Sequence, residues 1–481
     1  MTPSPRRACL GGFLALAVVA LAGRGAEPDR PPAPITRIAF GSCADQDRPL
    51  PIFDTIAAGK PELLLLIGDN IYADIDQKTG RLVPAAKITP ERIRECYDTL
   101  GKLPGYRKLK AACPVLATWD DHDLGHNDSG AEFPLKDESQ KLFLDFFGAA
   151  KDDPRRTQKG VYTSAVYGPA GKRVQVILLD TRYHRSAPKR AAKPLPGGRV
   201  PPYVPNTDAD ATVLGADQWA WLAGELKKPA EVRLLVSSIQ VIADEHPYEK
   251  WANFPKEREK LYEVIRTSGA NGVVILSGDR HLAEVSLDPA AAVGYPLYDV
   301  TSSGFNQGFK SWRPPEANAR RVAAMPYGDN FGMVLIDWSG DDPRLTLQVR
   351  DEDGDVTCGV KVRLSTLRGT GAAAAPRVKL PDGVLAPAEA AKKVGEKVTV
   401  QYAVGSTGGK VVLFLNSEKD FRNKANFAAV LTAKGQTGAW EKATGATFAG
   451  KTVRVTGTVK LNKDNPQIEV TDQKQLELVG E

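Results

Sequence analysis

Ten consecutive residues, Leu63–Tyr72 (LLLLIGDNIY), indicate the fold most directly. The first five are all large and apolar, which is typical of a strand that is buried on both faces of its sheet. Gly68, Asp69 and Asn70 follow at the point where such a strand would end. Ligands of α/β sheets gather beyond the carboxyl ends of the strands. This stretch therefore predicts an α/β fold with polar chemistry at one edge of a buried sheet.

Similar segments recur on both sides of this stretch. We expect buried strands at 37–40, 63–67, 115–119, 174–179, 232–236 and 272–276. Helical patterns lie between them at 51–58, 91–100, 139–147, 216–226 and 255–266. Strands that alternate with helices predict the α/β class. Later strands come with fewer helices and suggest a second sheet, at 297–300, 333–337, 345–349 and 361–364.

The chain of 481 residues has room for roughly two to four domains. We expect a large α/β domain at 35–367, a Gly-, Ala- and Pro-rich linker at 368–387, and a small all-β domain at 388–481. The small domain shows a short helix at 388–394 and β-rich segments at 398–404, 411–415, 427–432, 453–461 and 468–478. This pattern predicts a small barrel, with an OB-like fold as the leading interpretation.

Residues 1–26 have the features of a secretory signal peptide. Arg6 and Arg7 form a basic head, an apolar run spans 10–22, and residues 20–22 fit the small-residue cleavage pattern. The apolar run is shorter than the ~20 residues that cross a membrane. We therefore expect an exported chain, periplasmic or secreted, without a transmembrane anchor after cleavage. Arg6 and Arg7 favour the twin-arginine route, and an ordinary secretion signal is the alternative.

Charge and composition limit the chemistry. The 64 Lys and Arg residues exceed the 58 Asp and Glu residues by 6, which over this length is too little to argue for nucleic acid as the main partner. Only five His and five Cys are present. They cannot build a His-rich metal site or a disulfide-dense scaffold, so a bound metal would depend mainly on oxygen ligands.

Polar clusters follow four of the predicted strands directly, at 41–45 (GSCAD), 68–72 (GDNIY), 120–123 (DDHD) and 278–281 (GDRH). Each of them alone has a simpler explanation: a Gly-Asp after a strand is usually a turn in which the Asp side chain bonds the backbone, an Asp-Asp-His fits a surface loop, and a Cys is most often a buried thiol. The four together are harder to explain in that way, because charges at the mouth of a core are costly unless they are paired or bound to metal. We therefore predict one metal site built from all four segments.

In this order the four segments resemble those of the PhoD-like phosphatases, a branch of the calcineurin-like metallophosphoesterases. The resemblance covers about residues 37–367 and includes 179–183 (LDTRY) and 246–258, with WANFP at 251–255. It implies an αββα sandwich of two mixed sheets, a dinuclear-type metal centre, phosphoester hydrolysis and twin-arginine export. It also implies Fe(III) and Ca(II) as the metals, with other divalent metals as the alternative.

The expected metal ligands are Cys43, Asp45, Asp69, Tyr72, Asp121, Asp279 and His281. The thiolate of Cys43 and the phenolate of Tyr72 are anionic donors that suit trivalent iron. Carboxylates suit Ca²⁺, and the two oxygens of Asp69 would let it bridge two metals. By resemblance, Asp121 stands where the superfamily commonly carries an Asn ligand, and Asp279 stands where many members carry a His.

Asp121 and His122 are the predicted catalytic residues. A metal-activated hydroxide would attack phosphorus in line, and His122 would protonate the leaving oxygen. Arg182, Arg280 and Asn127 are predicted to bind the substrate, because a guanidinium group pairs well with phosphate oxygens. For the two arginines, a salt bridge to a neighbouring acid is an equally weighted alternative.

The small β domain leaves its partner open. Lys419, Phe421, Arg422, Lys424 and Phe427 mix cations with aromatic rings, as OB folds that bind polymers do. A solvated loop beside core aromatics explains the same mixture more simply. We expect a phosphoester as the substrate and an envelope polymer or nucleic acid as the further partner. An extracellular nuclease or a polymer-binding protein is the alternative function.

Overall fold

The computed structural model describes ten stretches of the chain: 33–195, 201–289, 292–312, 316–369, 383–409, 411–418, 421, 426–448, 451–462 and 465–479. The predicted signal peptide and most of the predicted linker lie outside these residues. The chain divides into two compact units, 1–371 and 372–481, and the division falls inside the segment predicted as a linker. Among the described residues, no helix combines the length and the apolar character that a membrane crossing requires.

The first sheet has six strands in the order β17-β16-β15-β1-β2-β5. Their bounds are β1 Arg37–Gly41, β2 Leu63–Ile67, β5 Val115–Thr118, β15 Asn330–Asp337, β16 Arg344–Asp351 and β17 Val356–Arg363. Strands β1, β2 and β5 run parallel, and β15, β16 and β17 extend the sheet in antiparallel pairs. Strand β2 has the predicted bounds, and all five of its residues are buried.

The second sheet has seven strands in the order β14-β12-β13-β11-β10-β7-β6. Their bounds are β6 Thr163–Tyr167, β7 Val174–Leu178, β10 Val232–Ser237, β11 Val273–Ser277, β12 Ala283–Asp288, β13 Leu297–Ser302 and β14 Arg321–Met325. Strands β7, β10, β11 and β13 form a parallel centre. Antiparallel pairs complete the two edges. Both large sheets are therefore mixed.

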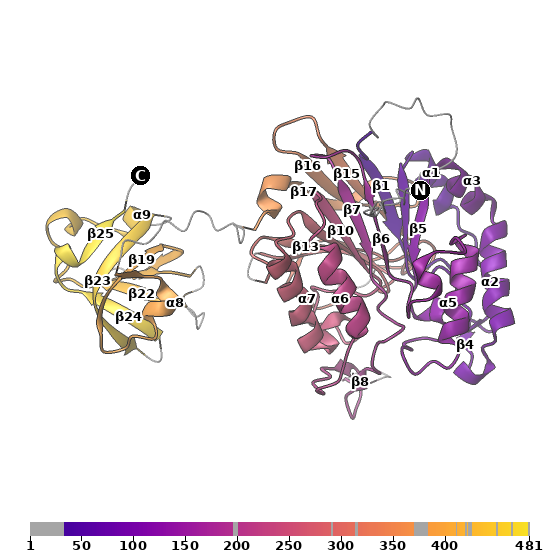
Figure 1. Ribbon diagram of the computed structural model, residues 1–481, viewed down its shortest axis with the longest axis horizontal. Coiled ribbons are helices and arrows are strands. Elements are labelled where there is room, and N and C mark those ends of the chain that lie inside the picture. Colours follow the sequence, from indigo (N-terminus) through magenta and orange to yellow (C-terminus); the bar gives the residue numbers. More distant parts are fainter. Residues whose placement is uncertain are drawn as a thin grey trace, which may run out of the picture. The chain divides into compact units, whose positions relative to one another are not determined.

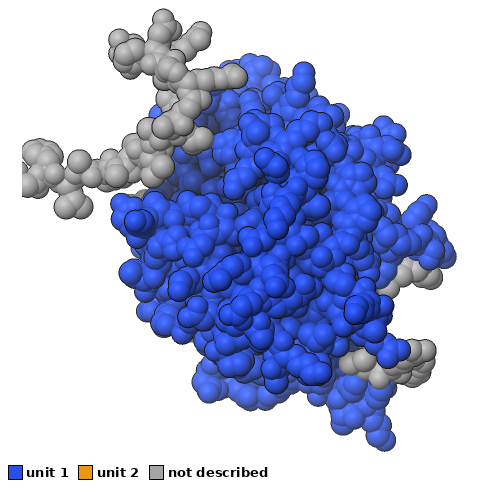
Figure 2. Space-filling model, turned by 90° about the vertical axis from the view of Figure 1, so that its right-hand side faces the viewer, with its two compact units in different colours: residues 1–371 blue, residues 372–481 orange. Residues whose placement is uncertain are grey.

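Alternate residues of the first sheet face two different cores, which explains why its strands are continuously apolar. Leu63 and Leu65 belong to a core shared with the second sheet, whereas Leu64 and Leu66 pack against helices on the other side. Helices α1, α2, α3 and α5 cover that outer side, and α6 and α7 cover the second sheet (Figure 1). Figure 2 shows one face of this unit in a space-filling view, with residues 1–371 in blue.

The helices of the first unit are α1 Ile52–Ala58, α2 Pro90–Lys102, α3 Pro104–Ala112, α4 Asp121–Leu124, α5 Lys136–Phe146, α6 Gly215–Glu225 and α7 Pro255–Ser268. Two short strand pairs lie outside the sheets, β3 Ile75–Asp76 with β4 Arg81–Leu82 and β8 Lys189–Arg190 with β9 Tyr203–Val204. Helix α4 is only four residues long, but it starts at Asp121 and so holds part of the predicted site.

The expected grouping of the late strands is wrong in one respect. Strands β15, β16 and β17 extend the first sheet, and the middle strands β7, β10 and β11 form the second. The apolar pattern of a strand shows that it is buried, but it does not show which strand lies beside it. The edge strands β6 and β14 escape sequence prediction because their residues are mostly half-buried and carry only a weak apolar signal.

The second unit contains one β-sheet in the order β18-β19-β23-β24-β22-β21-β20, with β25 beside β23. Its elements are β18 Val384–Leu385, α8 Pro387–Ala390, β19 Lys397–Ala403, β20 Ser406–Gly408, β21 Leu413–Asn416, β22 Ala428–Leu431, α9 Gly445–Phe448, β23 Thr452–Asn462, β24 Asn465–Val470 and β25 Leu476–Leu478. The segment 468–478, expected as one stretch, contains the end of one strand, a short 3₁₀ helix at Gln473–Gln475 and a second strand. An OB-like barrel stays a prediction.

Candidate metal centre

Ligand-type side chains from four strand ends converge at one edge of the two sheets. Cys43 follows β1, Asp69 follows β2, Asp120 and Asp121 follow β5, and Asp279 follows β11. Four groups of ligand atoms lie within 4.8 Å of one another: Cys43 with Asp69 and His281; Asp69 with Asp121 and His122; Asp69 with Asp120, Asp121 and Asp279; and Asp121 with Asp128 and Glu249. Asp69 belongs to three of these groups, so it stands at the centre of the cluster.

The backbone is strained at these positions. Among the described non-glycine residues, positive φ angles occur at Cys43, Asp69, Asp128, Asp279 and His281, and elsewhere only at Lys60. Such conformations cost free energy and cluster at functional sites. Gly68 has a φ of 119°, and a Cβ there would lie 2.7 Å from the Cβ of Asp120. Only glycine therefore lets the Asp69 and Asp120 loops approach so closely.

Cys43, Tyr72 and His281 form one side of the centre. The Cys43 Sγ lies 3.3 Å from Asp69 Oδ2, and the Tyr72 hydroxyl lies 3.4 Å from the same oxygen. The Tyr72 hydroxyl also lies 3.2 Å from His281 Nε2. Burial raises the pKa of Cys43 to about 11 and that of Tyr72 well above its ordinary value. A bound cation reverses this effect, because it deprotonates a thiol or phenol that ligates it.

The carboxylates form the other side of the centre, and they fit a bound cation. Asp69 Oδ1 and Asp120 Oδ2 are buried without a hydrogen-bond partner among the described residues. Burial raises the pKa of Asp69 and of Asp279 well above the ordinary value, and neighbouring acidic groups raise both further. An unpartnered buried carboxylate is costly unless a cation neutralises it. Oxygen donors of this kind, together with a thiol and a phenol, make a suitable metal site.

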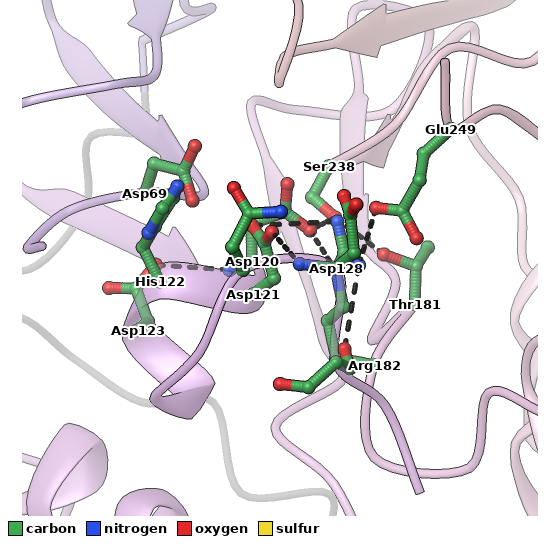
Figure 3. Close-up of polar contacts among 12 residues, drawn as sticks. Asp69, Asp120, Asp121, His122, Asp123, Asp128, Thr181, Arg182, Ser238 and Glu249 are labelled. Atoms are coloured by element: carbon green, nitrogen blue, oxygen red, sulfur yellow. Dashed lines mark hydrogen bonds and ion pairs between the residues drawn. The ribbon is translucent and has the colours of Figure 1, made fainter. Parts of the chain in front are cut away.

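Arg182 supplies positive charge behind these carboxylates (Figure 3). Its guanidinium is fully buried, pairs with Asp120 and lies 2.7 Å from Glu249 Oε2 and 3.6 Å from Asp121 Oδ1. Burial opposes the ionised form of Asp121, but Arg182 and His122 outweigh it and lower the pKa of Asp121. Arg182 therefore favours the charged form of Asp121 and orients the carboxylates of Asp120 and Glu249.

The carboxylate of Asp74 holds the imidazole of His122 in place. Its Nδ1 lies 2.6 Å from Asp74 Oδ1, and the second oxygen of Asp74 accepts the backbone N–H of Asn127 at 2.8 Å. Burial by itself lowers the pKa of His122, but Asp74 and Asp121 outweigh it and raise the pKa to about 10. The surrounding acids therefore favour the protonated imidazole, which donates its Nδ1–H to Asp74.

A cavity of about 700 Å³ opens above the cluster. Its floor carries Asp69, Asp121, His122, Asp279 and His281, and its walls carry Asn127, Asp128, Arg190, Tyr203, Tyr248, Glu249, Arg280 and Phe309. Two arginines of the wall lie flat on tyrosines. The Arg190 guanidinium is 3.8 Å from the ring centre of Tyr203, and the Arg280 guanidinium is 4.1 Å from that of Tyr248.

Most of the predicted site residues meet in this place, and two of them have other surroundings. Arg182 does not line the cavity, and the salt-bridge alternative describes its surroundings. Arg280 lines the cavity, but it also forms a salt bridge, in which its Nη2 lies 2.5 Å from Glu316 Oε2. Asp45 is buried, but its carboxylate lies 3.0 Å from Arg48 and accepts a hydrogen bond from Gln307. Asp45 belongs to none of the metal-ligand groups among the described residues.

Several residues of the site escape the sequence analysis. Asp74, Asp120 and Asp128 lie inside or beside the quoted segments. The sequence analysis assigned site roles to neighbouring residues instead of to these three. Ser303, whose hydroxyl lies 3.1 Å from Cys43 Sγ, and Glu249 come from distant loops. The spacing of Asp74 two residues after Tyr72 is a usable signal, because both stand in one strand-end loop. Nothing local marks Ser303 or Glu249.

Comparison with known proteins agrees with this geometry. The sequence pattern of the family described as PhoD-like phosphatase matches residues 38–303, which is more than half of the chain. The chain belongs to the PhoD-like phosphatase family. The matched range includes every residue of the cluster described above.

One curated protein and one solved structure are similar to the chain. The chain is 24% identical over 282 residues to alkaline phosphatase D of Bacillus subtilis (strain 168), a match that covers 53% of this chain and 47% of that protein. The chain thus matches about half the length of this relative. A solved structure titled "Structure of PhoD" is similar in fold, with a TM-score of 0.52, 18% identity and 69% of each chain covered. The two mixed sheets match that structure.

Proposed function

We propose that this PhoD-like chain is an exported, metal-dependent phosphoester hydrolase. The observation that carries the proposal is the position of Asp69. Its side chain lines the open cavity and belongs to three groups of ligand atoms, and its Oδ1 is buried without a hydrogen-bond partner among the described residues. Export is supported by the sequence of residues 1–26 and by the twin arginines at positions 6 and 7. The family relationship supports the reaction class.

The proposed ligand set has two sides that share Asp69. Cys43, Tyr72 and His281 would hold one metal, and the donor set of thiolate, phenolate and imidazole suits Fe(III). Asp120, Asp121 and Asp279 would hold the other, and carboxylate oxygens suit Ca(II) or another divalent ion. When bound, the metals supply Lewis-acid stabilisation of the phosphoryl oxygens and an activated water-derived nucleophile.

The protein itself binds the ester and handles one proton. Arg280 lies at the cavity wall between the ligands Asp279 and His281, and its Nε is buried without a hydrogen-bond partner among the described residues. We infer that this group binds a phosphoryl oxygen together with Asn127, which also lines the cavity. His122 lines the floor with its Nδ1 held by Asp74, so the rest of the ring can deliver a proton to the leaving oxygen.

A substrate panel tests the proposed function. Purified protein should contain metal by elemental analysis and should hydrolyse p-nitrophenyl phosphate, its bis ester or both. Removal of the metal with a chelator should abolish turnover, and returning metal should restore it. A metal-loaded protein that is inactive on a broad range of phosphomonoesters and phosphodiesters would contradict the proposal.

Replacing His122 should affect substrates according to their leaving groups. We expect His122→Asn to lower kcat by about 10²–10⁴-fold for an alkyl phosphoester, because the departing alkoxide needs a proton. The loss should be much smaller for a p-nitrophenyl ester, whose leaving group is stable as an anion. Asp74→Asn should show the same dependence more weakly, because it leaves the imidazole in place. Equal losses on both kinds of ester would contradict the role.

We further propose that the second unit binds an envelope polymer or nucleic acid. Lys419, Arg422 and Lys424 of the predicted basic stretch lie outside the described residues, whereas Phe421 is 59% exposed and Phe427 is buried in the core of the unit. A chain that ends at residue 369 keeps the buried Leu367 and tests this role. Small-ester turnover should stay within about twofold while polymer binding or cleavage falls at least tenfold. Equal effects on both would reject a separate role for the second unit.

A further inference from the structure

A second cavity of about 230 Å³ lies beside the cavity of the metal centre. The two share Leu195, Pro202, Tyr203 and Pro247 in their walls. The remaining wall comes mainly from the loop between β10 and α7, which contributes His246 and Lys250. The same loop supplies Tyr248 to the first cavity. A molecule bound at the metal centre therefore has a neighbouring space for another of its groups.

His246 presents a donor without an acceptor. Its Nδ1 accepts the backbone N–H of Tyr248 at 3.3 Å, so in the neutral ring the hydrogen is on Nε2. The ring is 4% exposed, and Nε2 has no hydrogen-bond partner among the described residues. Burial and the nearby Arg280 lower the pKa of His246 well below its ordinary value, which keeps the ring neutral. An N–H group buried in this way is costly unless something accepts its hydrogen.

Lys250 presents a positive charge without an acid at ion-pair distance among the described residues, although Asp244 and Glu316 act on it from farther away. Its Nζ donates to the carbonyl oxygens of His246 at 2.6 Å and Tyr248 at 3.0 Å, which leaves one of its three hydrogens unused. The residue is 4% exposed, and none of the ion pairs found among the described residues includes it. Burial and Arg280 lower the pKa of Lys250 to about 8, so the side chain remains largely a cation at neutral pH.

The acids at the rim of this cavity have other partners. Asp244 lies 3.8 Å from Arg258, and Glu245 accepts the backbone N–H of Ala319. Both acids are exposed to solvent, whereas His246 and Lys250 are buried. The wall of the cavity therefore carries one buried neutral donor and one cation without an ion-pair partner among the described residues, which together suit a small anionic oxygen group.

We propose that this second cavity is an anion subsite, which binds a carboxylate or a second phosphate on the organic part of the substrate. The proposal rests on the proposed function, because it names the substrate class of the same site. That class is a phosphoester whose alcohol carries another acidic group. A volume of about 230 Å³ suits such a group with a few carbon atoms and is too small for a polymer segment.

Kinetics of the metal-loaded full chain test the subsite. Three substrates should be compared: glycerol 1-phosphate without a second acid, 3-phosphoglycerate with a carboxylate, and glycerol 1,3-bisphosphate with a second phosphate. A charge-assisted hydrogen bond is worth about 1.5–3 kcal/mol, so Lys250→Met should raise KM roughly 10- to 100-fold for the acidic substrates. The KM for glycerol 1-phosphate and all kcat values should stay within about twofold. Comparing the KM values of 3-phosphoglycerate and glycerol 1,3-bisphosphate shows whether the subsite prefers a carboxylate or a phosphate.

A matched variant and a second substitution control for charge and folding. Lys256→Met removes the same charge from an exposed lysine that lies outside the cavity, and it should leave all KM values unchanged. His246→Gln should raise the KM for the acidic substrates, as Lys250→Met does. Circular dichroism identifies any variant that fails to fold. If either Lys250→Met or His246→Gln does not fold, the KM values of the other variant test the subsite. Equal KM changes on acidic and neutral substrates, or none with either variant, would overturn the proposal.

Direct binding separates this proposal from the proposed function. In the metal-free full chain the acids of the centre repel anions, so calorimetric titration with inorganic phosphate or acetate should report the subsite. Wild type should bind one anion, and Lys250→Met should reduce the affinity at least tenfold. This result can hold even if no phosphoester is hydrolysed. Absence of anion binding, or equal binding by wild type and Lys250→Met, would contradict the subsite whatever the activity.

Discussion

Asp69→Asn should lower turnover at least about a thousandfold and should reduce the metal content of the purified protein. The side chain belongs to three of the ligand groups, so its charge acts on both sides of the proposed centre. Asparagine has almost the same size and keeps one oxygen, so the change removes mainly the negative charge and the second oxygen ligand. Elemental analysis and turnover of p-nitrophenyl phosphate give the two readouts.

The same substitution should have the opposite effect on the metal-free protein. Asp69 is buried with Asp120, Asp121 and Asp279 within 4.8 Å, so the empty cluster repels itself. Neutralising one member should raise the Tm of the protein in chelator while lowering its gain in Tm upon metal addition. Asp152→Asn, on an exposed turn, is the matched control and should change neither. A Tm in chelator that falls with Asp69→Asn would contradict a repulsive cluster.

Arg182→Met should destabilise the first unit by about 3–5 kcal/mol, which is a large part of the stability of an ordinary domain. The substitution keeps the bulk of the side chain but leaves the buried Asp120 carboxylate without its cation and removes one of the two arginine partners of Glu249. Arg185 lies 2.6 Å from Glu249 and still partners that residue, so Asp120 bears most of the loss. Urea unfolding of the metal-free chain measures the change in the free energy of unfolding.

Two further variants show that geometry and burial cause this effect. Arg92→Met removes an arginine from a partly exposed pair with Asp47 at 3.5 Å, and it should cost under about 1 kcal/mol. Arg182→Lys keeps the charge but cannot reach both acids with a planar fork, so it should fall between wild type and Arg182→Met. Similar unfolding free energies for Arg182→Met and Arg92→Met would show that the buried ion pairs of Arg182 contribute no more to stability than a partly exposed pair does.

The sequence predicts the central strands well because burial on both faces leaves a clear pattern. Strand β2 occupies its predicted bounds, and β1, β5, β7, β10 and β11 agree within one or two residues. The neighbour of each strand is less predictable, since it depends on where the chain crosses between sheets. That is why β15, β16 and β17, expected in the second sheet, extend the first.

The candidate site is predictable where one loop carries several donors, and less so where donors come from afar. Asp69 and Tyr72 share a loop after β2, so their spacing is visible in the sequence, and they lie together in the structure. Arg182 looks like a phosphate-binding residue in sequence, and only the fold shows that Asp120 and Glu249 surround it. Asp45 is two residues from Cys43, but the local turn directs its carboxylate to Arg48.

The most direct test of the account is a crystal structure of the metal-loaded protein with anomalous scattering data. We expect two metal peaks, one beside Cys43 and Tyr72 and the other beside Asp121 and Asp279, with Asp69 contacting both. Metal–oxygen distances to Asp69 should be about 2.0–2.6 Å. A protein that is active with metal but shows no metal within reach of Asp69 would contradict the central claim.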